Sequence, residues 1–260
     1  DVAMWDLKAC LLDVPVVTLL GAMRPAVPAY GSGGFTSYSP ERLQEQLAGW
    51  VSEGMSRVKM KIGREPDHDL ERIRLARAAI GREAELYVDA NGAYARKQAL
   101  AMAERFQDYG VTWFEEPVTS DDLAGLRLLR DRAPASIEIS TGEYGYDLPY
   151  FRRLLEAEAV DVLQADLTRC GGITGFMDVA VLCDAFKVPL STHTAPALHM
   201  HPACCATPVR HLEYFHDHAR IEAMLFEGSV RPADGEMQPD LSQPGLGLTF
   251  RAQDAQRFEI

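Results

Sequence analysis

The sequence is short of basic residues, and this shortage limits its partners. Lys and Arg together number 26 against 38 Asp and Glu, so the formal net charge at pH 7 is −12. No local cluster of Lys and Arg reverses the sign. Because a strongly acidic surface repels phosphate backbones and anionic headgroups, we expect neither nucleic acid nor a membrane surface as a partner.

Long apolar runs are also lacking. No stretch approaches the roughly 20 apolar residues that span a bilayer, and the first residues hold no basic segment followed by the apolar core of a signal peptide. The sequence therefore predicts a cytoplasmic protein. The chain begins without Met and directly inside an amphipathic helical pattern, so we expect a preceding segment to be missing from it.

Cysteine is scarce, with five residues and no C-x-x-C spacing. Cys204 and Cys205 are adjacent, which is awkward geometry for a mutual disulfide. A soft-metal site would need further Cys nearby, and none is there. We therefore predict that the cysteines are reduced thiols packed as small apolar groups.

The composition is that of a globular protein, with 47% hydrophobic and 25% charged residues. Residues 27–229 alternate amphipathic helical stretches with β-prone runs at 27–30, 58–62, 86–88, 111–114, 137–140, 160–163, 188–191 and 209–212. This alternation predicts an α/β fold, a TIM-like barrel of parallel strands, with a doubly wound open sheet as the main alternative. Residues 1–26 are expected to form a helical linker. Residues 230–260 are expected to form a C-terminal segment over the barrel or over the missing segment.

Three carboxylates follow successive predicted strands, each about one βα unit after the last. Asp89 ends L-Y-V-D, Glu115 ends V-T-W-F-E, and Glu143 follows I-E-I-S-T-G. In a parallel barrel these positions meet at the carboxyl ends of the strands. Three anions side by side repel one another unless a cation neutralises them, and all-oxygen ligands suit a hard divalent ion. The spacing therefore predicts a Mg2+ site.

Two lysines share one face of a predicted strand. In V-K-M-K-I, Lys59 and Lys61 point one way while the apolar residues between and around them point to the helices. Both lysines are then expected in the barrel interior. There, burial and the neighbouring ammonium group would lower a lysine pKa toward the range of a general base.

A second pair of polar residues ends the next two strands. Asp166 follows V-L-Q-A and His193 follows P-L-S-T, again one unit apart, so the carboxylate can orient the ring and stabilise its protonated form. The other six histidines, His199 among them, have no such spacing. Glu213 ends the last strand, where it would either donate a hydrogen bond to an oxyanion, if protonated, or cap a loop.

Two familiar motifs are absent. The run C-G-G-I-T-G at 170–175 lacks both the G-x-G-x-x-G spacing and the P-loop Lys, so it reads as a tight turn between strand and helix. No nucleophile elbow with a Ser-His-Asp arrangement occurs either.

Together, the motifs K-M-K, V-D-A-N, F-E-E-P, T-G-E, Q-A-D and S-T-H resemble the enolase superfamily, specifically its mandelate racemase subgroup. The muconate-cycloisomerase-like subgroup places a lysine where His193 and Asp166 stand here. The resemblance covers the whole chain, and residues 4–22 are similar to the segment that joins an N-terminal capping domain to the barrel. It implies a modified (β/α)7β barrel whose N-terminal α+β capping domain is missing from this chain.

The resemblance also implies roles for the strand-end residues. Asp89, Glu115 and Glu143 would bind one Mg2+. Lys61 would be one acid/base and the His193–Asp166 pair the other. The substrate would be contacted by Lys59, which would also tune Lys61, and by Asn91 and Glu213.

The implied reaction is Mg2+-dependent removal of the proton α to a carboxylate, giving an enediolate, a pattern general to enolase-superfamily sites. We favour dehydration of an acid sugar to a 2-keto-3-deoxy acid, because the paired acid can protonate a leaving hydroxyl. A racemase or epimerase of an α-hydroxy acid is the first alternative, and a non-catalytic Mg2+-binding barrel fragment the second. A small-molecule carboxylate substrate and a homo-oligomer are further expectations.

Overall fold

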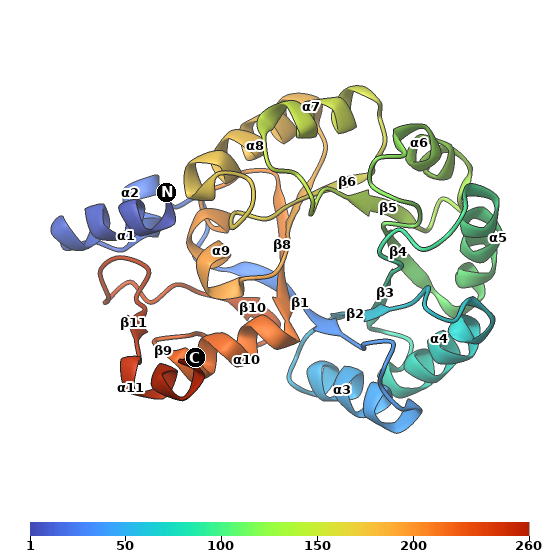
Figure 1. The fold of residues 1–260 in the computed structure, drawn as a ribbon, viewed down its shortest axis with the longest axis horizontal. Coiled ribbons are helices and arrows are strands. Elements are labelled where there is room, and N and C mark those ends of the chain that lie inside the picture. The colour runs from blue at the N-terminus through green and yellow to red at the C-terminus, as the bar shows by residue number, and fades with distance from the viewer. Residues whose placement is uncertain (260) are drawn as a thin grey trace.

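The computed structural model describes residues 1–259, and its centre is a barrel of eight parallel strands (Figure 1). The strands are β1 (Val27–Gly33), β2 (Arg57–Lys61), β3 (Glu85–Asp89), β4 (Val111–Glu115), β5 (Glu138–Thr141), β6 (Val162–Ala165), β7 (Leu190–Thr192) and β8 (Val209–Phe215). Each overlaps one of the predicted runs. Strand β8 pairs with β1, which closes the sheet and rules out the doubly wound alternative.

Helices connect successive strands and surround the barrel (Figure 1). They are α3 (Pro40–Ser52), α4 (Pro66–Ile80), α5 (Arg96–Phe106), α6 (Leu123–Arg132), α7 (Leu148–Glu156), α8 (Gly172–Phe186) and α9 (Pro196–Ala203), with α10 (His216–Leu225) after the last strand and the short η1 (Gln107–Tyr109) before β4. Outward strand residues such as Met60, Val88 and Phe114 pack against these helices in one continuous core. The inward faces are therefore left for polar groups at the carboxyl ends and for a separate apolar layer below them.

That lower layer closes the barrel beneath the strand ends. Tyr30, Tyr87, Trp113 and Val162 form a buried cluster. The ring centroids of Tyr30 and Tyr87 are 5.5 Å apart in an edge-on arrangement, and those of Tyr87 and Trp113 are 5.1 Å apart in a stack. Because these side chains fill the interior, the barrel is a packed core and its chemistry is confined to one end.

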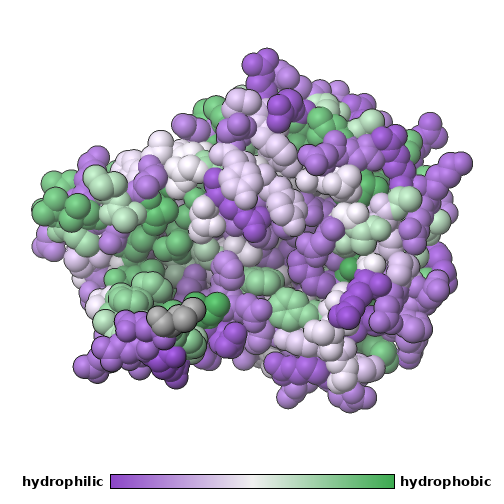
Figure 2. Space-filling model, viewed as in Figure 1, coloured by the Kyte–Doolittle hydropathy of each residue, from purple (hydrophilic) through white to green (hydrophobic). Residues whose placement is uncertain are grey.

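The two terminal segments lie together at one side of the barrel (Figure 1). They comprise α1 (Val2–Leu11), α2 (Val16–Leu20), β9 (Phe226–Glu227), β10 (Glu236–Met237), β11 (Thr249–Phe250), α11 (Ala252–Ala255) and η2 (Gln256–Phe258). The Val16 N–H donates to Gly245 O at 2.8 Å, and the Leu246 N–H donates to Asp6 Oδ1 at 2.7 Å. Figure 2 shows hydrophobic residues gathered over α1 and α2, where Leu11 is 77% exposed.

The structure tests two predictions made from the composition, one on membrane-spanning segments and one on the cysteines. Within residues 1–259, no helix combines the length and apolar character needed to cross a bilayer. Four of the five thiols are free and buried, Cys204 and Cys205 included. The prediction of packed thiols is wrong for Cys10, which is exposed because α1 lies outside the ring of helices.

Gly142 is the residue through which β5 delivers Glu143 to the strand ends. Its φ is +135°, and a Cβ there would lie 2.1 Å from the Gln164 carbonyl oxygen. We expect Gly142→Ala to lower the free energy of unfolding by about 2–5 kcal/mol, since it combines backbone strain with overpacking. Urea unfolding measures this. The control is Gly21→Ala, where φ is +92° but nothing lies within 4 Å, and a loss of about 1 kcal/mol is expected. Equal losses would contradict the steric argument.

Candidate active site

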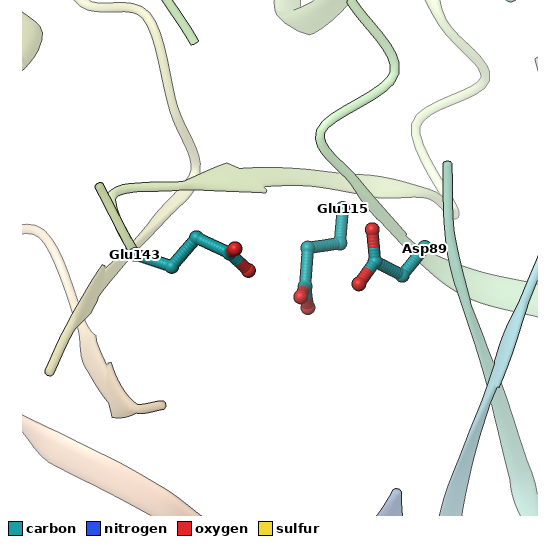
Figure 3. Close-up of side chains that lie close together, drawn as sticks. All are labelled: Asp89, Glu115 and Glu143. Carbon is teal, nitrogen blue, oxygen red and sulfur yellow. The ribbon is translucent and has the colours of Figure 1, made fainter. Parts of the chain in front are cut away.

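Three buried carboxylates meet at the carboxyl ends of the strands. Asp89 ends β3, Glu115 ends β4, and Glu143 lies just beyond β5. Each offers one oxygen, and these oxygens lie within 4.8 Å of one another. Figure 3 shows the Glu115 carboxylate between those of Asp89 and Glu143. The structure therefore brings together the three groups that the spacing in the sequence singled out.

The charge balance of this cluster fits a divalent cation. Burial, and to a smaller extent the neighbouring Asp89 carboxylate, raise the pKa of Glu115 to about 8. The Oε2 atom of Glu143 is buried and makes no hydrogen bond, although it lies 3.2 Å from His193 Nε2. Crowded, desolvated carboxylates with an unused acceptor are the donor set that a hard ion such as Mg2+ prefers. Asp89, Glu115 and Glu143 can therefore bind a metal ion.

A fourth carboxylate, Glu116, borders the cluster and escaped the sequence reasoning. Its side chain is buried, and its carboxylate accepts a hydrogen bond from Thr141 Oγ1 at 3.0 Å. Burial and the nearby Glu143 raise the pKa of Glu116 to about 9. In a regular strand, Glu116 would face the helices, opposite Glu115. Instead the strand ends before Glu116, whose φ is +41°. The motif F-E-E-P does not predict this turn.

The two lysines of β2 enter the barrel beside these carboxylates. Lys59 is fully buried, and its Nζ lies 2.6 Å and 2.7 Å from the two Glu115 oxygens and 2.8 Å from Glu213 Oε1. Lys61 is nearer the mouth, with its side chain 16% exposed, and its Nζ donates to Asp89 Oδ2. Both lysines therefore face the interior, as the alternation in V-K-M-K-I predicts.

The predicted direction of the lysine pKa shifts is wrong for this structure. Burial lowers the pKa of Lys61, but the carboxylates of Asp89, Glu115 and Glu213 together outweigh that effect and the net pKa is raised. The pKa of Lys59 is raised well above its ordinary value, because Glu115 and Glu213 together outweigh burial. The prediction rested on burial and on the second ammonium group. The carboxylates that the neighbouring strands place against each lysine reverse its direction.

His193 and Asp166 form a hydrogen-bonded pair at the ends of β7 and β6. His193 Nδ1 lies 2.9 Å from Asp166 Oδ2, while Asp166 Oδ1 accepts from the N–H of Thr168 at 2.8 Å and from its hydroxyl at 2.7 Å. Burial lowers the pKa of His193, but the Asp166 carboxylate at Nδ1 and the Glu143 carboxylate near Nε2 together outweigh burial and raise the pKa to about 10. With Nδ1 engaged by Asp166, Nε2 faces Glu143 of the carboxylate cluster.

Glu213 and Asn91 are placed differently from each other. Both Glu213 oxygens are engaged, one with Lys59 and the other as acceptor of the Thr194 N–H at 2.7 Å. Burial raises the pKa of Glu213, but Lys59 and His193 outweigh it and lower the pKa. These contacts favour an acceptor over the protonated donor considered from the sequence. Asn91 is exposed at the rim, and its N–H donates to Asp89 Oδ1 at 2.8 Å.

Added Mg2+ is expected to stabilise the protein through the carboxylate cluster. Binding to the folded state at a hundredfold excess over Kd contributes about 2.7 kcal/mol, equivalent to a Tm increase of about 5–10 °C for a domain of this size. Thermal unfolding with Mg2+ and with EDTA measures the increase. Glu143→Gln keeps the shape of the site but removes one charge, so its Tm should respond to Mg2+ by less than half as much. An equal response in both proteins would place the ion elsewhere.

Comparison with known proteins agrees with this architecture. The family model described as "Enolase C-terminal domain-like" matches residues 42–255. The crystal structure of a mandelate racemase/muconate lactonizing enzyme-like protein from Rubrobacter xylanophilus superposes with a TM-score of 0.96 and 52% identity, over 98% of this chain and 71% of that one.

Two further relatives carry functional names. L-Talarate dehydratase from Polaromonas sp. JS666, solved with Mg and L-glucarate, has a TM-score of 0.88 and 31% identity, over 98% of this chain and 70% of that one. D-Galactarolactone cycloisomerase from Agrobacterium fabrum is 30% identical over all of this chain and 72% of its own length. The chain spans 62% to 72% of the first curated relatives it matches. These matches confirm the resemblance seen in the motifs: the chain belongs to the enolase C-terminal domain-like family.

Proposed function

We propose that the protein removes the proton α to a substrate carboxylate, and that it dehydrates an acid sugar to a 2-keto-3-deoxy acid. One observation carries this proposal. Lys61 Nζ lies against Asp89, and His193 Nε2 lies against Glu143. The Glu115 carboxylate lies between these two carboxylates, so the three form a row (Figure 3). A substrate held at the row would thus lie between two groups able to exchange protons.

Removal of the α-proton requires positive charge in the site. A proton next to a carboxylate is weakly acidic, because its removal puts a second negative charge on a group that already carries one. Mg2+ bound by Asp89, Glu115 and Glu143 would supply positive charge where the second charge develops. Lys59, fully buried and cationic between Glu115 and Glu213, would add a fixed positive charge next to the substrate carboxylate.

The reaction consists of two proton transfers and the departure of one hydroxyl group. One of Lys61 and His193 takes the α-proton in its neutral form, which a cation bound by the neighbouring carboxylates would favour. The electron pair of the broken C–H bond moves into the bond toward the carboxylate. The pair returns to form a double bond between the α- and β-carbons as the β-hydroxyl leaves. The other residue donates the proton that converts this hydroxyl to water. The enol that remains tautomerises to the 2-keto-3-deoxy acid, so the net change is loss of one water.

The names of the relatives support a sugar-acid substrate without identifying it. L-Talarate dehydratase and D-galactarolactone cycloisomerase are similar to this chain at 31% and 30% identity. A racemase or epimerase is the second candidate, favoured by the same pair of groups on two sides of the row, because a proton removed on one side can return from the other. A homo-oligomeric state and a cytoplasmic location stay predictions from the sequence.

A substrate screen tests the proposal. The protein with Mg2+ is incubated in heavy water with mono- and diacid sugars and small α-hydroxy acids, and a semicarbazide assay detects α-keto acids while NMR follows the remaining acid. Formation of a keto acid from one sugar supports dehydration. Deuterium at the α-carbon with no keto acid would instead identify a racemase or epimerase. Bound Mg2+ with neither product from any acid would favour the non-catalytic barrel.

A further inference from the structure

His199 is a fully buried histidine on α9 with no part in the proposed proton transfers. Its ring bonds to two separate loops, one after β6 and one after β7. The Leu167 N–H donates to His199 Nε2 at 3.0 Å, and His199 Nδ1 lies 2.9 Å from Thr194 O. Leu167 directly follows Asp166, and Thr194 directly follows His193. The ring therefore bonds to the neighbour of each member of the acid/base pair.

These contacts define the proton on the His199 ring. Nε2 accepts an N–H, so it carries no proton, while Nδ1 faces carbonyl oxygens and must be the donor. The ring is thus the neutral tautomer with its proton on Nδ1. Burial lowers the pKa of His199 to about 4, in agreement with a neutral ring at physiological pH. One donor and one acceptor on a rigid ring fix the separation of the two loops.

The loop after β7 needs such support because its backbone is strained. Thr194 and Ala195 both have positive φ, 51° and 38°, a region that side-chain-bearing residues rarely occupy. His199 Nδ1 also lies 3.1 Å from Ala195 O, so the ring bonds to both strained residues. Loss of these bonds would let the loop relax toward ordinary φ values and would move His193, the residue directly before it.

We propose that His199 is a positioning residue that couples the two loops and so keeps His193 within hydrogen-bond distance of Asp166. The packing around the ring fits this role. Phe176 of α8 lies edge-on to His199, with the ring centroids 5.4 Å apart, so the imidazole plane is fixed from a third side. The kinetic consequence rests on the proposed function, whereas the coupling of the loops does not.

A matched pair of variants separates this role from general stability. His199→Phe keeps an aromatic ring against Phe176 but removes the donor and the acceptor. His201→Phe is the control. His201 is buried in the same helix, but its Nδ1 accepts the Val17 N–H of α2 at 3.2 Å, so the ring bonds away from the two loops. The readout is the NMR signal of the His193 Nδ1 proton, which its bond to Asp166 shifts downfield. We expect His199→Phe to lose this signal and His201→Phe to keep it.

The same variants are then assayed on the acid that the screen identifies. Because supporting hydrogen bonds typically alter activity 10–100-fold, His199→Phe should lower kcat by about that factor while KM changes by less than about twofold. His199→Gln, which restores one donor and one acceptor, should recover part of the loss and also covers the case in which the Phe variant does not fold. An unchanged His193 signal with unchanged kcat in His199→Phe, or equal losses in His201→Phe, would overturn the proposal.

The two proposals fail in distinguishable ways. If the wild-type protein converts no acid, the proposed function fails, while the His193 signal in the two variants still decides the role of His199. If the wild type is active and His199→Phe is equally active with its His193 signal intact, only the positioning role fails.

Discussion

Turnover by a His193→Asn variant is expected to fall about 1000-fold below that of the wild-type protein, the middle of the range for loss of a general acid or base. Asparagine can still bond to Asp166 but cannot accept or release a proton at the position of Nε2. Lys61→Ala should give a loss of the same order, because each residue serves one side of the carboxylate row. Steady-state kinetics on the acid found by the screen measures both variants.

The matched control for this prediction is His68→Asn. Within residues 1–259 the His68 side chain bonds only to Glu65, and it is 71% exposed, so its replacement should leave kcat within about twofold of the wild-type value. Circular dichroism and Mg2+ binding confirm that each variant is folded. A His193→Asn protein that retains more than about a tenth of the wild-type kcat would remove His193 from the catalytic role.

Replacement of Lys59 by methionine is expected to destabilise the protein by about 3–5 kcal/mol in the absence of Mg2+. Lys59 is the buried cation between Glu115 and Glu213, and its loss leaves two desolvated carboxylates facing each other. Methionine keeps the length and packing of the side chain, so the charge is what changes. Urea unfolding with EDTA present measures the difference.

The dependence on pH follows from the carboxylates left behind. Burial and Asp89 raise the pKa of Glu115 from its ordinary 4.5 to about 8 even with Lys59 in place. Lys59 lowers this pKa, so the loss of Lys59 raises it further. Between pH 4.5 and pH 8 the Glu115 contribution to stability falls equally in both proteins. The deficit of Lys59→Met should therefore grow above about pH 8, where Glu115 ionises in the wild type and keeps its proton in the variant. Lys187→Met, which removes one of the exposed Lys187–Asp184 pair, should show little change. A deficit independent of pH would indicate lost packing instead.

The strand-end residues were predictable because each βα unit of the barrel places one of them at the carboxyl end of its strand. Asp89, Glu115 and Glu143 recur once per βα unit, and a closed parallel sheet brings such positions to one end. The alternation in V-K-M-K-I placed Lys59 and Lys61 inside for an equally general reason. Both arguments need only the spacing along the chain and the closure of the sheet.

Other features depend on contacts that spacing does not encode. His199 has no distinctive position in T-H-T-A-P-A-L-H, and its role depends on a loop 32 residues away in sequence, contacted through Leu167. Glu116 belongs to the site because the backbone turns at positive φ, which F-E-E-P does not signal. The raised lysine pKa values follow from pairings across strands, because the carboxylates that face each lysine together outweigh its burial.

In the proposed reaction the α-proton of the substrate is removed and exchanged with solvent. The most direct test is the fate of hydrogen at C3 of the keto acid when the protein and Mg2+ convert the identified acid in heavy water, followed by NMR. We expect C3 to gain one deuterium from the solvent, because the α-proton leaves through Lys61 or His193 and the enol is then protonated from solvent. A keto acid whose C3 carries only hydrogen from the substrate would indicate an internal hydride shift and would exclude proton removal by either residue.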